Sequence, residues 1–208
     1  MLLSKIKAVN GVYEKYKPNT LEEVLANVVL AKNTFGQSIN RYTSKYNVIY
    51  QLRFYNPYLF ETEITDFAYM IFGFTNDVFH RIAYGLDYWF IQSESKDKNA
   101  GVSTKNYYQR INFLRNKKRI NQQDAETLCN FSRARNFGTH YGKLVFIDYI
   151  FCNIHIINNL LEVTIQLLQN TANVNDLEYR RYLNGQLDFI NDLENTLNSY
   201  IMENNISL

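Results

Sequence analysis

The sequence contains few of the residues that interrupt helices or cross-link chains. Its 208 residues include two prolines and two cysteines. Pro18 and Pro57 both lie between periodic segments, so they interrupt few of the possible helices. Cys129 and Cys152 lie among apolar residues and belong to no CxxC pair. We therefore expect reduced core cysteines in a reducing compartment, which excludes a disulfide-rich secreted domain.

The motifs of several reaction classes are also missing. The sequence has no HExxH, CxxC or EF-hand spacing, no glycine-rich phosphate loop and no GxSxG. We therefore expect no metal and no cofactor. The first residues, MLLSKIKAVN, lack the apolar core of a signal peptide, and charged residues interrupt the most apolar stretches. These features predict a soluble cytoplasmic protein that does not associate with a membrane.

Helical periodicity, in contrast, extends over nearly the whole sequence. A Thr20-x-x-Glu23 capping box begins one helical pattern, and Asn121 is expected to cap another. Strand-like alternation never extends beyond four residues. We predict a single all-α domain over residues 1–208 with long helices, of which the most apolar is central. The expected helices cover residues 18–56, 58–93, 104–120, 121–137 and 143–170, with an amphipathic last helix at about 174–204.

Basic residues gather in one stretch, although the net charge is only +2. Residues 105–119 carry six lysines or arginines and no acid, and aromatic residues are interleaved with them. Such an arrangement suits the backbone of a nucleic acid. The alternative is a solvated helix face whose aromatic side belongs to the core. The residues of this strip that we predict to bind RNA are Arg115, Lys117, Lys118 and Arg119.

One cluster of residue types stands out within CNFSRARNFGTHYGKLVF. Arg133, Asn136 and His140 are spaced i, i+3 and i+7, so they share one stripe of a helix. Arg135 would lie about 140° away from His140 on an ideal helix. We expect Gly138 to loosen the helix and bring Arg135 round towards the histidine.

These residue types are those that phosphodiester cleavage needs. An arginine can hold a phosphate through two hydrogen bonds and stabilise the charge that develops on it. A histidine titrates near neutral pH, so it can move a proton at a ribose hydroxyl. An asparagine can orient the imidazole or hold the nucleotide. Arg135 is our first candidate for the catalytic arginine, and Arg133 is expected to support it as a phosphate contact.

The segment Arg135-Asn136-x-x-x-His140 resembles the R-x(4–6)-H signature of HEPN domains in its common form, Arg-polar-x-x-x-His. A match this tight is expected by chance about 0.02 times in a chain of this composition. The resemblance covers about residues 20–170. It implies an antiparallel helical bundle and a metal-independent endoribonuclease in which Arg135, Asn136 and His140 are catalytic. It also implies a toxin or antiviral defence protein, for example in abortive infection.

The resemblance also implies partners. HEPN domains typically dimerise so that two motifs meet in a cleft, so we expect RNA as substrate and a symmetric homodimer. An antitoxin or another defence-system protein is a further expected partner. Tyr141, Phe146 and Tyr149 lie near the motif and are candidates for the dimer interface; the alternative is that they fill the core of the monomer. Tyr141 and Arg133 complete the predicted RNA-binding set.

Two functional interpretations therefore remain open. The first is the ribonuclease, and the second is a catalytically silent HEPN-like module that binds RNA or a partner protein. The remaining histidines, His80 and His155, each stand alone on a largely apolar helix. We expect both to be core or boundary residues without a role in chemistry.

Overall fold

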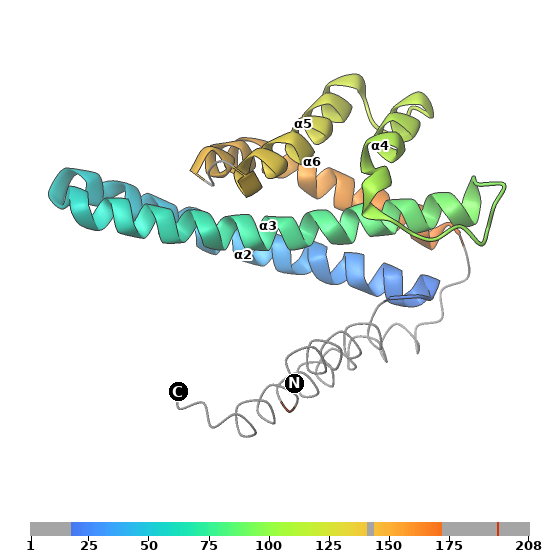
Figure 1. Ribbon diagram of the computed structural model, residues 1–208, viewed down its shortest axis with the longest axis horizontal. Coiled ribbons are helices and arrows are strands. Elements are labelled where there is room, and N and C mark those ends of the chain that lie inside the picture. Colours follow the sequence, from blue (N-terminus) through green and yellow to red (C-terminus); the bar gives the residue numbers. More distant parts are fainter. Residues whose placement is uncertain (1–17, 141–143, 172–194, 196–208) are drawn as a thin grey trace. The chain divides into compact units, whose positions relative to one another are not determined.

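The computed structural model describes residues 18–140, 144–171 and 195, and only the backbone of residues 140, 144–146 and 148. The chain forms two compact units, residues 1–26 with 173–208 and residues 27–172. Most of the described residues are helical and none of them is in a strand, which confirms the all-α class (Figure 1). Their elements are α2 (Leu21–Tyr55), α3 (Pro57–Ser93), the 3-10 helix η1 (Thr104–Asn106), α4 (Tyr107–Asn116), α5 (Gln122–His140) and α6 (Leu144–Gln169).

Side-chain caps fix the start of α2 and of α5. Thr20 Oγ1 accepts a hydrogen bond from the Glu23 N–H at 3.3 Å, and Glu23 Oε2 accepts one from the Thr20 N–H at 3.1 Å. This reciprocal pair is the expected capping box. Asn121 Oδ1 accepts from the Asp124 N–H at 2.7 Å, so Asn121 caps α5 as predicted.

A single residue separates α2 from α3, so the two helices form an antiparallel pair. That residue, Asn56, caps α3 by accepting a hydrogen bond from the Leu59 N–H at 3.1 Å. Pro57 stands at the first position of α3, where its missing N–H is not needed. Along the pair, Tyr42 of α2 meets Phe67 of α3 edge-on, with ring centroids 6.3 Å apart.

α3 is the helix around which the described residues are arranged. It packs against η1, α4, α5 and α6. α3 and α6 run parallel. Phe67 stacks on Phe151 in the first half of both helices, and Ser93 Oγ at the end of α3 lies 3.3 Å from Thr171 Oγ1 just after the end of α6. The expected antiparallel packing therefore holds for α2 and α3 but not for α3 and α6. The predicted central helix, α6, packs beside α3 instead.

At Gly85, α3 approaches two other helices closely. A Cβ atom at Gly85 would lie 2.8 Å from Val28 Cγ2 of α2 and 3.1 Å from Thr164 Cγ2 of α6. These distances leave no room for a side chain, so the glycine allows α2, α3 and α6 to pack together.

A buried carboxylate ties η1 and α4 to α3. Asp87 is fully buried and accepts hydrogen bonds from the Ser103 N–H at 2.7 Å, Asn106 Nδ2 at 3.2 Å and Arg110 Nε at 2.8 Å. The Arg110 guanidinium also lies 3.6 Å from the centre of the Phe90 ring. Arg110, a member of the basic stretch, is therefore a structural cross-link whose charge is neutralised inside the protein.

The third helix is shorter than predicted, because a Schellman motif ends it. The Arg119 N–H donates to the Leu114 carbonyl oxygen and the Lys118 N–H donates to that of Arg115, each at 2.9 Å. The motif needs a left-handed residue, and Lys118 adopts φ 57° there. Lys117, Lys118 and Arg119 consequently lie in a turn rather than on a helix face. Periodicity extended the prediction to residue 120 because no glycine or proline marks the end.

Other predicted features differ in detail. Both cysteines are free, but Cys129 is only partly buried and Cys152 is exposed, so the expected core placement is wrong. α6 is kinked at Asn153 (φ −121°, ψ 16°), whose side-chain amide donates to the Tyr149 carbonyl oxygen at 2.8 Å. The predicted last helix at about 174–204 lies outside the described residues.

One described segment, Tyr149–Gln169, is long and apolar enough to cross a membrane by length and composition, with a mean hydropathy of 1.2. The core helix of a water-soluble protein has the same properties. α6 packs against α3 and α5, and Glu162 in this segment pairs with Lys32 of α2 at 3.1 Å. This one segment is not enough to indicate a membrane protein.

Candidate functional site

Three tyrosine hydroxyls hold α5, the helix that carries the arginine–histidine motif. Tyr107 and Tyr108 of α4 donate to the carbonyl oxygens of Leu128 and Cys129, at 3.2 and 3.1 Å. Tyr149 of α6 donates to the carbonyl oxygen of Thr127. Consecutive carbonyls of α5 are thus anchored to the helices on either side. This anchoring fixes the rotation of α5 and hence the direction of each motif side chain.

α5 continues through Gly138 to His140. The expected loosening at Gly138 does not occur within the described backbone, since hydrogen bonding along the helix is maintained. Backbone positions 135 and 140 are therefore about 140° apart around the helix axis, as an ideal helix gives for residues five apart. The His140 side chain and Tyr141 lie outside the described residues.

Arg135 reaches across to α3 and makes contacts that its sequence neighbours do not reveal. Its Nη1 donates to Asn76 Oδ1 at 3.0 Å and lies 3.3 Å from His80 Nε2. Its Nη2 donates to Asn136 Oδ1 at 2.8 Å, and its guanidinium lies 4.4 Å from the centre of the Phe79 ring. The structure thus brings together two of the three predicted catalytic residues, Arg135 and the exposed Asn136.

The Arg135 charge is held in place without being neutralised. Among the described residues no carboxylate pairs with Arg135, and its Nε is buried without a hydrogen-bond partner. Burial lowers the pKa of Arg135 from its ordinary value, with Tyr108 opposing that change. An arginine stays protonated at neutral pH even so. Arg135 is therefore a half-buried cation positioned by neutral groups, which is an arrangement that suits an anion.

His80 and His155 are exposed rather than part of the core; one side of the His80 ring is buried beside Phe79, so His80 is a boundary residue, whereas the prediction is wrong for His155. α3 and α6 are apolar on average but still present one stripe to solvent, and the histidines lie on those stripes. His80 in particular belongs to the Arg135 cluster. The available signal was the i, i+4 spacing of Asn76 and His80, which places both side chains on one face of α3.

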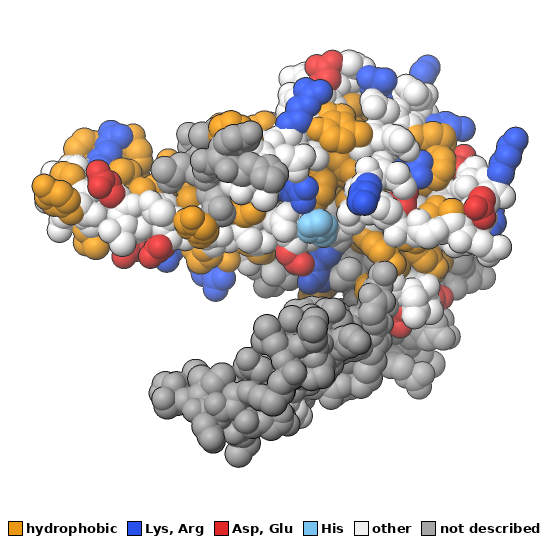
Figure 2. Space-filling model, in the orientation of Figure 1, with side chains coloured by type: hydrophobic (Ala, Val, Ile, Leu, Met, Phe, Trp, Pro, Cys, Tyr) orange, Lys and Arg blue, Asp and Glu red, His pale blue; other side chains and the backbone are white. Residues whose placement is uncertain are grey.

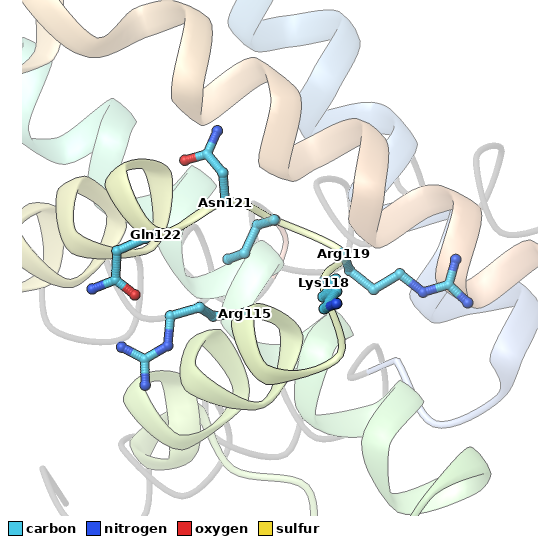
Figure 3. Close-up of a pocket in the computed structure, with 6 residues that line it drawn as sticks. Arg115, Lys118, Arg119, Asn121 and Gln122 are labelled. Carbon is cyan, nitrogen blue, oxygen red and sulfur yellow. The ribbon is translucent and has the colours of Figure 1, made fainter.

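Basic residues at the end of α4 and in the turn after it line a shallow hollow of about 470 Å³ (Figure 3). Arg115 and Gln122 point to the same side of it, whereas Arg119 points away from them. No acidic side chain among the described residues pairs with Arg115, Lys118 or Arg119. Lys117 is exposed beside Phe113, 5.4 Å from the ring centre. We name this feature the α4–α5 hollow; its lining residues are Arg115, Lys118, Arg119, Ile120, Asn121 and Gln122.

A second hollow of about 280 Å³ shares Arg115 with the first. Its walls include Arg133 and Cys129 of α5. Burial raises the pKa of the Cys129 thiol, while the positive charges of Arg133 and Arg115 oppose this rise. Arg133 also donates to Asn130 Oδ1 at 3.2 Å.

Arg133 and Arg135 thus lie in different surroundings. They are two residues apart, and an ideal helix turns by about 200° over that interval. Arg133 joins Arg115 in the hollow between α4 and α5, whereas Arg135 joins the α3 residues. Figure 2 shows basic side chains spread over the α4 and α5 part of the surface.

No group of His, Cys, Asp and Glu side chains in the described part of the chain is arranged to hold a metal ion. Comparisons with protein-family models, with curated proteins and with solved structures found no match for this chain. The case for a function therefore rests on the residues and their geometry.

Proposed function

We propose that the protein is a metal-independent endoribonuclease of the HEPN type. The observation that carries the proposal is the state of Arg135. Its guanidinium is held by the oxygens of Asn76 and Asn136, and no carboxylate among the described residues neutralises it. A fixed cation without an acidic partner is suited to a phosphate group and to the negative charge that develops on it during cleavage.

In the proposed reaction the ribose 2′-oxygen attacks the adjacent phosphorus and the bond from phosphorus to the 5′-oxygen breaks. The 2′-hydroxyl loses a proton and the leaving 5′-oxygen gains one. His140 is the proposed proton-transfer residue, since imidazole titrates near neutral pH. Arg135 stabilises the phosphorane oxygens, and Asn136 holds the guanidinium in position. The products are a 2′,3′-cyclic phosphate and a 5′-hydroxyl.

A homodimer is part of this proposal. Backbone positions 135 and 140 lie about 140° apart around the axis of one α5 helix, which is too far apart for them to share one face of that helix. A two-fold axis beside α5 offers a way to combine them, because Arg135 of each protomer can then meet His140 of the other. A shared site of this kind contains two proton-transfer groups and two phosphate contacts.

The hollows beside α4 supply a path for the RNA backbone. Arg115, Lys118 and Arg133 line them without a carboxylate partner among the described residues, so their charges are available to phosphates. An RNA-cutting enzyme in the cytoplasm harms its own cell unless it is restrained. We therefore assign the protein to antiviral defence or to toxin systems, with an inhibitory or activating partner protein.

The alternative function is a catalytically silent module that binds RNA or a protein. The observation that favours it is the unbroken course of α5 through Gly138, which leaves positions 135 and 140 of one protomer on different faces of the helix. This alternative keeps the basic hollows and the Arg135 cluster as binding surfaces and omits proton transfer.

A direct test is incubation of the purified full-length protein with total RNA in EDTA, beside the His140→Ala variant. The matched control is His155→Ala, which removes an exposed histidine of α6 instead. We expect cleavage by the wild type and by the control but not by His140→Ala. The ends should be cyclic phosphates, detected because alkaline phosphatase releases phosphate from them only after acid treatment.

Undiminished cleavage by His140→Ala would exclude the proposed role of the motif. Activity that disappears in EDTA and returns with Mg²⁺ would exclude a metal-independent reaction. RNA binding by all three proteins without any cleavage would support the silent module.

A further inference from the structure

The contact between Arg135 and His80 assigns a protonation state to the histidine. Arg135 Nη1 can only donate a hydrogen bond, and it lies 3.3 Å from His80 Nε2. Nε2 must therefore act as the acceptor, so the imidazole is neutral and carries its proton on Nδ1. A protonated His80 would direct an N–H and a second positive charge towards the guanidinium.

The groups around His80, on balance, also favour its neutral form. Burial of one side of the ring lowers the pKa of His80; the charge of Arg135 lowers it further, and Asp77 opposes both effects. The buried side packs edge-on against Phe79, with ring centroids 5.7 Å apart. Asp77 is itself paired with Arg81 at 2.7 Å, so its opposing effect is partly neutralised. From α4, Tyr108 acts on Arg135 rather than on His80.

Binding of an anion at Arg135 would reverse this balance. A phosphate oxygen on the guanidinium compensates the charge that disfavours imidazolium, and it offers an acceptor to a protonated Nε2. His80 is exposed and lies on the same cluster, so a group bound to Arg135 is within its reach. Arg135 and a protonated His80 would then both donate to one phosphate.

We propose that His80 is a second phosphate-binding residue of the Arg135 site, and that it takes up a proton when a phosphate of RNA binds there. The inference rests on the part of the proposed function that places RNA at Arg135. It assigns to His80 a role that the arginine–histidine motif does not contain. Because proton uptake and RNA binding are linked, each favours the other by the same factor.

The direction of the pH dependence follows from the protonation state of His80 in the free protein and in the RNA complex. The free protein holds His80 neutral at neutral pH, and the complex holds it protonated. RNA affinity from this source is therefore largest at low pH and falls as pH rises between the pKa values of the free and bound states. In that interval the Kd rises by up to about tenfold per pH unit.

The test is a titration of the three histidines by NMR over about pH 5 to 8 in the full-length protein. The probe is a single-stranded RNA with 2′-O-methyl riboses, which cannot be cut by attack of a 2′-hydroxyl. His80→Gln identifies the His80 signal, and Arg135→Gln removes the cation. We expect the pKa of His80 to lie below its ordinary value in the free protein and to rise when the RNA is added.

In Arg135→Gln the pKa of His80 should be higher than in the wild type when free, and RNA should change it much less. Saturating RNA that leaves the pKa of His80 unchanged in the wild type would overturn the inference. A response to inorganic phosphate but not to RNA would overturn it as well.

The two proposals can fail separately. If the wild type cuts ordinary RNA while the probe leaves the pKa of His80 unchanged, the proposed nuclease activity stands and the proposed role of His80 fails. If His80 responds to the probe and no RNA is cut, the nuclease fails and the phosphate site stands. His155→Gln, which changes an exposed histidine of α6, should leave the pH dependence of RNA binding unaltered.

Discussion

Arg135 Nη1 lies 3.3 Å from Nε2 of His80, a residue that is 55 positions earlier in the chain. The contact joins α5 to α3 through two groups that would repel each other if both were charged. It exists because three neutral partners, Asn76, Asn136 and the unprotonated imidazole, surround a cation that no described carboxylate neutralises. The positive charge of Arg135 is therefore left uncompensated by these neutral partners, and an additional anion would compensate it.

Arg135→Ala should reduce RNA cleavage strongly, by roughly 100-fold to 1,000-fold, which is the usual cost of removing one stabilising donor from a transition state. Arg133→Ala should reduce it less, because Arg133 lines the second hollow instead of the α3 cluster. Single-turnover rates at saturating enzyme measure both effects. Melting curves of the variants control for any loss of structure, since Arg135 also contacts Phe79.

A greater loss in Arg133→Ala would reverse the assignment of the two arginines. Arg133 shares a helix stripe with His140, and α5 is continuous between them. That outcome would mean that the catalytic pair lies within one protomer and that the Arg135 cluster only binds.

Neutralising Arg115, Lys117 and Lys118 together as glutamines should weaken RNA binding at every salt concentration. Removing one contact with a phosphate of single-stranded RNA lowers the slope of log Kd against log salt by about 0.7. Fluorescence anisotropy over a series of salt concentrations gives both quantities. We expect a smaller slope than in the wild type, because these side chains lack carboxylate partners among the described residues.

The matched control carries the same charge change elsewhere. Lys45, Lys96 and Lys98 are exposed on α2 and in the loop after α3. Their replacement by glutamine should leave the salt slope close to that of the wild type. Equal slopes in the two triple variants would mean that the α4–α5 hollow is an ordinary solvated surface.

Local signals in the sequence predicted much of the fold. Thr20 and Asn121 cap helices where the patterns placed them, since capping depends on neighbours a few residues away. The end of α4 was missed because a lysine, not a glycine, occupies the left-handed position at 118. Periodicity indicates which positions are apolar, and it cannot detect a turn made by a residue that usually avoids that conformation.

The candidate site was predicted only in part, for a different reason. The motif identified Arg135 and Asn136, which are adjacent in sequence and bonded in the structure. His80 and Asn76 were missed because their relation to Arg135 depends on how α3 packs against α5, which is a tertiary property. The same holds for Arg110, whose buried partner Asp87 lies 23 residues away.

Lys118→Gly should make the protein more stable and a weaker RNA binder. A lysine at φ 57° is strained, and glycine adopts that conformation without a penalty of about 1–2 kcal/mol. Urea unfolding measures the first effect and anisotropy measures the second. Lys117→Gly is the control, because residue 117 has an ordinary φ of −81° and should gain nothing. A destabilised Lys118→Gly would contradict the assigned strain.

Asp87→Ala should destabilise the protein by about 3–5 kcal/mol, the usual cost of leaving one member of a buried ion pair alone. Asp87 is fully buried, and the Arg110 side chain is 12% exposed. Asp77→Ala is the matched control, since the Asp77 side chain is 58% exposed and its i, i+4 pair with Arg81 is worth about 0.3–0.5 kcal/mol. Chemical unfolding of both variants checks the ranking. Similar losses would mean that the Asp87 network contributes little beyond a surface pair.

The homodimer can be tested by mixing subunits. If each site combines residues of two protomers, an inactive His140→Ala subunit impairs the sites of any wild-type subunit that it joins. With free exchange of equal amounts, about one quarter of the dimers are wild type, so activity should fall below the average of the two parents. Mixing with His155→Ala should give the average, because that histidine is on the exposed stripe of α6.

The interface itself needs a patch near the motif. Tyr149 is a poor candidate, since its hydroxyl binds the Thr127 carbonyl oxygen and its ring stacks on Phe131 at 6.5 Å inside the protomer. Tyr141 and the Phe146 side chain lie outside the described residues.

Phe137, within the motif, is 47% exposed and follows the Asn136 that holds Arg135. Phe137→Asp should therefore separate the protomers, because a charge on each side of a two-fold contact is repelled by its copy. Analytical ultracentrifugation should show monomers, and cleavage should be lost with them. A monomeric variant that cuts RNA at the wild-type rate would show that one protomer completes the site alone.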